Sequence, residues 1–296
     1  MDLHYLRLFN TLAKELNFSR AADALFISQP AVSMQIKKLE NDLNLKLFDK
    51  IGKNIFLNDN GKILYDYTKK VFSLVEEAET RLLSINGEFR GNINIGASNT
   101  PGTYILPKVL GKFKEQYPSV NTTLHVANTY RIEKMIFENK IDFAINGGDI
   151  PYKSQVYVER MAEDKLLFVA SPESKYITTL EIEPKDLSDA KFIVHEKNSQ
   201  LFKLTEEIVG KLGFPLNINM SLGSIDAIKQ AVAAGLGISI IPKSTITTEI
   251  KYEILKEINL KGLGWIYPYN LIYHKNKNLS PIAEKLIEMI RDKMKS

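Results

Sequence analysis

Apolar residues recur every three or four positions through residues 3–43, and this spacing predicts three amphipathic helices. The first covers about residues 3–16. The other two lie between Phe18 and Leu43 and are joined by a tight turn. Ser19 is expected to cap the first helix of this pair. Ser28 is expected to cap the second, where Pro30 is tolerated because it falls in the first helical turn.

The last of these helices has one apolar face and one polar face. Val32, Ile36, Leu39 and Leu43 are spaced four, three and four apart, so they share a stripe that faces inward. A capped helix with an apolar back and a front of Gln, Ser and Lys fits the major groove of DNA. Helix pairs with apolar stripes also occur as plain structural units in many proteins. On the DNA-binding interpretation, the front face and N-terminal tip contribute Ser28, Gln29, Pro30, Ser33, Met34, Lys37 and Lys38.

A β-hairpin is predicted for residues 47–57, where a turn containing Gly52 separates two short extended runs. Its position directly after the helix pair makes it the wing of a winged helix-turn-helix. Lys50 and Lys53 would then contact phosphates or the adjacent minor groove.

One long helix is predicted from Asn60 to about Glu88. Its apolar residues Leu64, Tyr67 and Leu74 belong to a stripe with alternating spacings of three and four, the pattern of a helix that packs along a partner helix. The partner is either a second copy of the chain or a neighbouring domain. A second copy would place two recognition helices on one duplex.

Beyond a boundary near Arg90, strand-like and helix-like segments alternate. Repeated β-α-β units predict parallel sheets with helices on both faces. The expected strands are residues 93–96, 122–126, 141–146, 166–170, 192–194, 216–222 and 238–241, and the expected helices are residues 101–117, 132–138, 201–212 and 225–234.

Two loops that follow strands carry groups that a small anion needs. Residues 96–103 and 195–200 are rich in hydroxyl and amide side chains, and each loop opens into a helix. Backbone N–H groups at a helix start can complete an anion site, and ligands of open α/β sheets bind beyond the carboxyl ends of the strands. Simple helix capping explains either loop alone equally well. The candidate effector-binding residues are Ser98, Asn99, Thr100, Thr103, Gly147, Gly148, Asn198, Ser199, Gln200 and Ser224.

The motifs in these segments resemble those of one family. Ala21-Ala22, residues 28–33 (SQPAVS) and Leu47-Phe48 resemble the winged helix-turn-helix of LysR-type transcriptional regulators. Residues 91–107 (GNINIGASNTPGTYILP), 141–145 (IDFAI) and 231–238 (AVAAGLGI) resemble the two-lobed, periplasmic-binding-protein-like α/β domain that these regulators use as a sensor.

The resemblance implies an α+β multidomain fold. We expect a DNA-binding domain at residues 1–58, a linker and dimerisation helix at residues 59–90, and an effector-binding domain at residues 91–296. Within the last, lobe I would comprise about residues 91–160 and 266–296, and lobe II about residues 161–265.

The same resemblance implies a bacterial transcription regulator. It would bind double-stranded DNA, respond allosterically to a small anionic metabolite held between the lobes, and form a homodimer or homotetramer, with RNA polymerase as a further candidate partner. Residues 96–107 and 146–151 are most similar to regulators of carbon fixation (RuBisCO operons) and of sulfur assimilation. Met34 departs from the family, where Arg or Gln is common, so base reading falls to Gln29 and Ser33, or Met34 contacts a thymine methyl.

Composition narrows the alternatives. The 296-residue chain contains no Cys, and its four His show no ligand spacing, so neither a metal nor a cofactor is expected. Without a nucleophile–base pair or a GxGxxG fingerprint, an enzyme is not expected either.

The lack of a signal peptide and of a run of about 18 apolar residues predicts a cytoplasmic protein with no membrane partner. The net charge is weaker evidence for DNA binding, because residues 1–58 hold eight Lys and Arg against six Asp and Glu. The remaining alternative is a cytoplasmic small-molecule-binding protein whose N-terminal region only dimerises.

Overall fold

The structure is a computed structural model of the chain, and it describes residues 2–52, 54–85, 89–178, 180–261 and 264–295. Its contacts divide the chain into two units, residues 1–88 and residues 89–296. Each unit is described by itself. Among the described residues, no helix has the length and apolarity needed to cross a membrane, and no group of His, Asp or Glu is placed to hold a metal ion.

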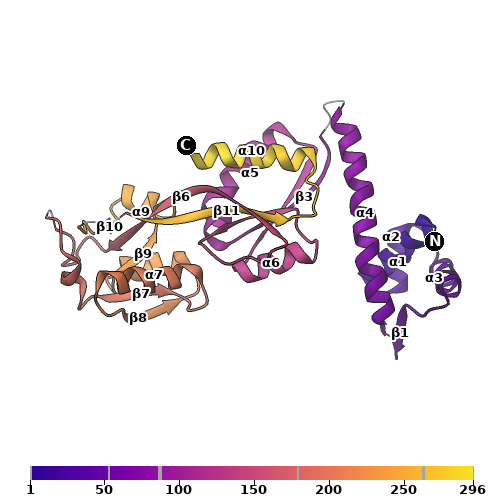
Figure 1. Ribbon diagram of the computed structural model, residues 1–296, viewed down its shortest axis with the longest axis horizontal. Helices are drawn as coiled ribbons and strands as arrows, with labels where there is room; N and C mark the ends of the chain where they lie inside the picture. The colour runs from indigo at the N-terminus through magenta and orange to yellow at the C-terminus, as the bar shows by residue number, and fades with distance from the viewer. Residues whose placement is uncertain (1, 53, 86–88, 179, 262–263, 296) are drawn as a thin grey trace. The chain divides into compact units, whose positions relative to one another are not determined.

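Residues 1–88 form a helical bundle, a hairpin and a long helix (Figure 1). The elements are α1 (Leu3–Glu15), α2 (Phe18–Leu25), α3 (Gln29–Leu43), β1 (Phe48–Ile51), β2 (Asn54–Leu57) and α4 (Asp59–Ile85). Phe9, Leu12, Ala21 and Val32 are each fully buried in one core that also receives Leu47 from the start of the wing. The predicted winged helix-turn-helix and long helix are therefore confirmed.

The cap of α2 corrects one prediction. Asn17, and not Ser19, is the N-cap: its backbone is extended (φ −154°, ψ 122°), and its Oδ1 accepts hydrogen bonds from the amides of Ser19 and Arg20 at 2.9 and 3.1 Å. Ser19 lies within the first turn of the helix, where its side chain cannot serve as the cap. Helix α3 begins as predicted, with Oγ of Ser28 accepting from the amide of Ala31 at 3.4 Å.

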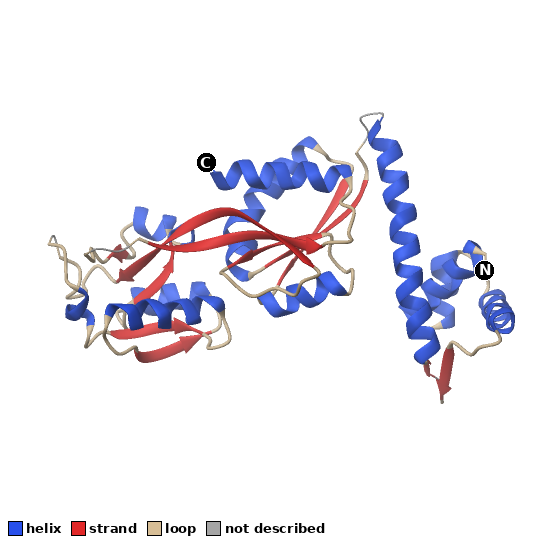
Figure 2. Cartoon of the chain, in the orientation of Figure 1, coloured by secondary structure: helices blue, strands red, loops and turns tan. Residues whose placement is uncertain are grey.

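Residues 89–296 form two α/β lobes joined by two long antiparallel strands, β6 (Val156–Ala170) and β11 (Trp265–His274), which Figure 2 shows running from one lobe to the other. In lobe I, the parallel strands β4 (Val120–Val126), β3 (Gly91–Ala97) and β5 (Phe143–Gly147) continue the sheet beyond β11. Helices α5 (Leu106–Gln116) and α10 (Pro281–Lys295) cover one side of these strands and α6 (Thr129–Phe137) the other (Figure 1).

Lobe II repeats the alternation of strands and helices on a smaller scale. Its strands β7 (Lys191–His195) and β8 (Asn217–Leu222) are parallel, whereas β9 (Ser239–Pro242) and β10 (Lys256–Glu257) pair antiparallel to β6. The remaining elements are η2 (Pro184–Leu187), α7 (Gln200–Leu212), α8 (Ile225–Ala233), η3 (Lys243–Thr245) and α9 (Thr247–Lys251). The predicted parallel pairing therefore holds within each lobe, while strands that pair with the two crossing strands are antiparallel.

The helix predicted for residues 101–117 is in fact two elements. A π-helical segment, η1 (Pro101–Ile105), precedes α5 (Leu106–Gln116). Pro107 has no N–H and so cannot continue a regular α-helix through its position, whereas it is well tolerated in the first turn of a new one. The backbone stays helical from Pro101 to Gln116, and only the hydrogen-bond pattern of the first turn differs.

Candidate DNA-binding surface and effector pocket

Helix α3 presents its predicted DNA-contacting face to solvent. Its apolar side, with Val32, Ile36 and Leu39, is 0–4% exposed. The exposed residues on the other side and at the N-terminus are Ser28, Gln29, Pro30, Ser33, Met34, Lys37 and Lys38. Lys50 is exposed on β1, and Lys53 lies outside the described residues.

Two contacts around this face were not foreseen from the sequence. Lys38 lies over the ring of Tyr5 at 5.1 Å, and the hydrogen bond with Tyr5 raises the pKa of Lys38, so this cation is held against α1. Glu40 is buried at the end of α3, where it accepts hydrogen bonds from the Leu47 amide (2.9 Å) and from Lys46 Nζ (2.8 Å). These bonds fix the start of the wing relative to α3.

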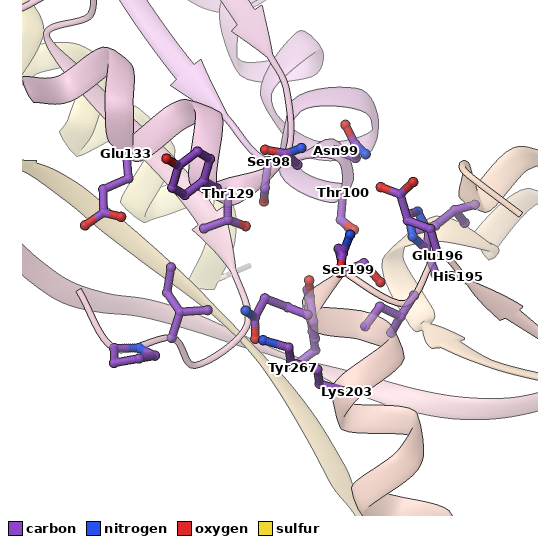
Figure 3. Close-up of a pocket in the computed structure, with 18 residues that line it drawn as sticks. Ser98, Asn99, Thr100, Thr129, Glu133, His195, Glu196, Ser199, Lys203 and Tyr267 are labelled. Carbon is purple, nitrogen blue, oxygen red and sulfur yellow. The ribbon is translucent and has the colours of Figure 1, made fainter. Parts of the chain in front are cut away.

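A cavity of about 470 Å³ lies between the two lobes, at the carboxyl ends of β3 and β7 (Figure 3). Lobe I contributes the loop after β3 and the start of α6, and lobe II contributes the loop after β7 and the start of α7. The lining residues are Ser98, Asn99, Thr100, Asn128, Thr129, Tyr130, Glu133, Ile150, Pro151, His195, Glu196, Asn198, Ser199, Gln200, Leu201, Lys203, Ile225 and Tyr267.

Hydroxyl groups from both lobes lie at the centre of this pocket. Figure 3 shows Ser98 and Thr100 of lobe I facing Ser199 of lobe II. Ser98 and Thr100 are 6% and 5% exposed, so both side chains are buried in the pocket wall. Oγ of Ser98 accepts the amide of Gly147 at 2.8 Å, which leaves the serine proton available to a ligand.

Each lobe also directs a helix N-terminus into the pocket. Asn128 caps α6 and accepts from the Arg131 amide at 3.0 Å, and Ser199 caps α7 and accepts from the Phe202 amide at 3.0 Å. The first turn of a helix has backbone N–H groups without intrahelical partners and a partial positive charge. Two such ends, one per lobe, make the pocket suited to an anion.

The formal charges at the rim are mixed. Glu133 and Glu196 lie at opposite ends of the pocket in Figure 3, with Lys203 below the central hydroxyl groups. Oε1 of Glu133 accepts a hydrogen bond from the Lys153 amide at 3.3 Å. The pocket therefore offers donors to an anion at its centre and acceptors at its two ends.

Two buried rings complete the walls. His195, at the end of β7, is 5% exposed, and burial lowers its pKa below the usual value of 6.5, so the imidazole is neutral near pH 7. Its Nδ1 is buried and has no hydrogen-bond partner among the described residues. Burial raises the pKa of Tyr267 on β11, whose phenol consequently remains protonated.

The structure brings six of the candidate effector residues to the pocket: Ser98, Asn99, Thr100, Asn198, Ser199 and Gln200. The other four do not line it. Thr103 is exposed on η1, and Ser224 caps α8 by accepting from the Ala227 amide at 3.2 Å. Gly147 and Gly148 lie behind the pocket wall: a Cβ at Gly147 would collide with the ring of Tyr267, and Gly148 has a φ of +90°.

Several residues that line the pocket were not predicted from the sequence. Asn128 and Thr129 follow β4 as a cap and first helical residue, so the rule applied to residues 96–103 would have found them. Glu133 lies one turn further along the same helix. Tyr267 gives no local signal, since only the pairing of β11 with β6 brings it to the pocket.

Comparison with known proteins places both units in one family. Residues 3–62 match the model of the bacterial regulatory helix-turn-helix protein, lysR family, and residues 86–295 match the LysR substrate binding domain. The chain belongs to the LysR family. It is a LysR-type transcriptional regulator with an effector-binding domain, and the family consists of regulators and not of enzymes.

Relatives of this LysR-type regulator support the predicted subgroup. A probable RuBisCO transcriptional regulator of Cyanidium caldarium is 35% identical over 263 residues, covering 87% of this chain and 83% of the relative. A protein of the same name from Trichormus variabilis is 33% identical over 293 residues, covering 97% and 87%. The resemblance to carbon-fixation regulators is thus confirmed.

Solved structures share the fold of the regulator. A full-length OxyR variant of Pseudomonas aeruginosa covers 100% of this chain and 95% of its own, with a TM-score of 0.73 and 18% identity. Full-length CbnR complexed with its target DNA covers 99% and 100%, with a TM-score of 0.65 and 19% identity. The regulatory domain of Synechocystis PCC6803 CcmR, in complex with 2-PG, covers 70% and 99%, with a TM-score of 0.64 and 23% identity.

Proposed function

We propose that this LysR-type regulator acts in the cytoplasm and senses a small phosphorylated or carboxylated metabolite in the pocket between its lobes. Residues 1–58 would bind DNA, residues 59–90 would link and dimerise, and residues 91–296 would bind the effector. The observation that carries the proposal is the pair of helix N-termini, those of α6 and α7, which meet around the hydroxyl groups of Ser98, Thr100 and Ser199.

The two rim carboxylates refine the chemical class of the effector. Glu133 and Glu196 would repel negative charge placed next to them, so we propose that the anionic groups of the ligand lie centrally and that any hydroxyl or amino group it carries lies toward the carboxylates. Lys203 then supports the anionic end. CcmR has been solved with 2-PG and QuiR with shikimate, which are examples of ligands in this fold.

On the DNA side, we propose that Gln29 and Ser33 read bases while Lys37, Lys50 and Lys53 contact phosphates. Ser28, Pro30, Met34 and Lys38 would complete the surface, with Lys38 oriented by Tyr5. This assignment rests on the exposure of the α3 front face opposite a buried apolar stripe.

The test is calorimetric titration of the full-length protein with inorganic phosphate, 2-phosphoglycolate and 3-phosphoglycerate, followed by footprinting of bound genomic fragments with and without each compound. Saturable binding that shifts a footprint would support the proposal. Binding to a small molecule with no selected DNA site at low salt, where phosphate contacts are strongest, would favour the small-molecule-binding alternative. If none of the three compounds binds, the proposed anionic class is wrong.

A further inference from the structure

A hydrogen bond between side chains of η1 and α8 joins the two lobes outside the effector pocket. Oη of Tyr104, on η1 in lobe I, donates to Oδ1 of Asp226, in the first turn of α8 in lobe II, at 2.7 Å. The two residues are 122 positions apart. Their contact therefore depends on how the lobes are held across β6 and β11.

Lys229 holds the acceptor of this bond in place. Its Nζ lies 2.9 Å from Asp226 and 2.9 Å from Glu249, and it donates to the carbonyl of Thr245 at 3.1 Å. It also lies 4.8 Å from the centre of the Tyr104 ring. Because the Lys229 side chain is 8% exposed and makes all of these contacts, it is an ordered support and not a solvated surface cation.

The protonation states suit this arrangement. The hydrogen bond with Lys229 lowers the pKa of Asp226, so the acceptor is an anion at neutral pH. Burial, together with the bond to Asp226, raises the pKa of Tyr104 to about 12, so the phenol keeps its proton and donates. A hydrogen bond to an ionised acceptor is stronger than one between neutral groups.

Both ends of the bond are continuous with the pocket walls. Thr100 lines the pocket and is the residue before η1, which carries Tyr104. Ile225 lines the opposite wall and is the residue before Asp226. A ligand that displaces either wall would act directly beside one of the two elements that carry the bond.

The network also reaches the crossing strands. Ser244, beside Thr245, donates its amide to Oδ2 of Asp164 on β6 at 3.1 Å, and its Oγ lies 3.2 Å from Oη of Tyr269 on β11. The contacts around Lys229 are thus connected to the two strands about which the lobes would rotate.

We propose that the Tyr104–Asp226 bond is a latch that favours the closed arrangement of the lobes and couples it to occupancy of the pocket. By linkage, a contact made only when the lobes are closed favours any ligand that binds the closed arrangement. The side chain of Asp226 is 64% exposed, which limits the effect to roughly 2- to 10-fold in the equilibrium between arrangements. The coupling to ligand rests on the proposed function, whereas the latch itself can be tested without any ligand.

The first test is hydrogen exchange in the full-length protein without ligand, comparing the wild type with Tyr104→Phe. The chain offers a matched control in Tyr176→Phe: Oη of Tyr176 donates to Asp189 at 2.9 Å, and Lys175 lies 2.7 Å from the same carboxylate, all inside lobe II. We expect Tyr104→Phe to accelerate exchange on both walls of the pocket and in β6 and β11, by about 2- to 10-fold. Tyr176→Phe should act only near its own site.

If Tyr104→Phe changes exchange only around η1, as a local contact would, the latch is overturned. A second variant removes ambiguity: Tyr104→Phe should add no further acceleration in an Asp226→Ala background, because the bond is already lost. Additive effects of the two substitutions would contradict the proposal.

The ligand-dependent test is titration of wild type and Tyr104→Phe with 2-phosphoglycolate. Weaker binding by the variant, by about 2- to 10-fold, is expected if the ligand favours closed lobes. Equal binding by both proteins would overturn the coupling while leaving the effector pocket intact. If neither binds, the proposed effector class fails, and hydrogen exchange still decides whether the latch exists.

Discussion

Oγ of Ser98 accepts a hydrogen bond from the backbone amide of Gly147, and this 2.8 Å contact joins the carboxyl ends of two neighbouring parallel strands, β3 and β5. The amide of Ser98 in turn donates to the carbonyl of Ile145 at 3.1 Å. Ser98 thus has a structural role, closing the strand ends, and this contact leaves its hydroxyl proton available to a ligand in the pocket. Its two roles can be separated by experiment.

We expect Ser98→Ala to lower the free energy of unfolding by about 1–3 kcal/mol, because the buried amide of Gly147 loses its acceptor. The same variant should bind 2-phosphoglycolate more weakly. Urea unfolding and calorimetry measure the two effects. Thr103→Ala, five residues away on an exposed position of η1, is the control and should change neither. An unchanged unfolding free energy for Ser98→Ala would show that the strand-end contact contributes nothing.

His195 should make the stability of the protein depend on pH. Burial lowers its pKa in the folded state, so below the usual value of 6.5 the unfolded chain takes up a proton more readily than the folded one. The contribution of His195 to the free energy of unfolding is therefore fully present above about pH 6.5, and it is lost as the pH falls toward the folded-state pKa. The loss should be smaller in His195→Gln.

Unfolding free energies of wild type and His195→Gln, measured from about pH 5.5 to pH 8, isolate this contribution because the acidic residues titrate in both proteins. Parallel pH profiles would mean that His195 is not the group responsible. His274→Gln, at a more exposed histidine on β11, is a control expected to retain the wild-type slope.

Most of the fold followed from periodicity in the sequence. The stripe on α3 and the β-α-β alternation survive in the structure because both reflect burial of a face, which is a local property of the pattern. The errors occurred where one side chain decides the outcome. Asn17, and not Ser19, caps α2 because it lies one residue outside the helix. Pro107 has no N–H to donate, and the helix predicted for residues 101–117 starts with the π-helical turn η1 in place of a regular α-helical turn.

Only part of the pocket lining could be predicted from the sequence in the same way. Ser98, Thr100 and Ser199 follow strands and precede helices, so their position at the strand ends could be predicted. Lys203 and Tyr267 could not, since the first requires knowing which face of α7 meets lobe I and the second requires the register of β11 against β6. Chemistry supplied by long-range packing leaves no spacing signal in the chain.

Charge at the rim of the pocket gives a third prediction. Glu133→Gln removes a negative charge while keeping an oxygen that can accept the Lys153 amide. We expect 2-phosphoglycolate to bind this variant about 2- to 5-fold more tightly, because like-charge repulsion is reduced. Calorimetry measures the change, and it should shrink with added salt. A loss of affinity would contradict the proposed repulsion between Glu133 and the ligand.

The DNA-binding face yields a prediction that separates base reading from phosphate contact. Ser33→Ala should weaken binding to a selected site by about 1–3 kcal/mol while leaving random DNA unaffected. Lys50→Ala should weaken both alike and reduce the dependence of affinity on salt. Fluorescence anisotropy at several salt concentrations distinguishes the two patterns. Equal losses on specific and random DNA for Ser33→Ala would remove its base-reading role.

Helix α4 offers the test of assembly. Tyr67, Leu74 and Leu82 recur at intervals of seven and eight residues and are 57–66% exposed within their unit. An apolar stripe of this length on one helix favours packing against a partner, and of the two partners that the sequence pattern left open we expect the second copy. We expect Leu74→Asp to shift the protein toward monomers in analytical ultracentrifugation, because an ionised carboxylate would be buried in the pair.

Glu79→Gln is the control for Leu74→Asp. It changes the charge by one unit on a residue about 140° around the helix, and it should leave the oligomeric state unchanged. The alternative, in which the stripe packs against a neighbouring domain of the same chain, makes a different prediction. Leu74→Asp would then lower the unfolding free energy without changing the molecular mass. If Leu74→Asp both dissociates the dimer into monomers and weakens binding to two-fold-related DNA sites, the stripe is the assembly surface. Two recognition helices must be joined to read such a site.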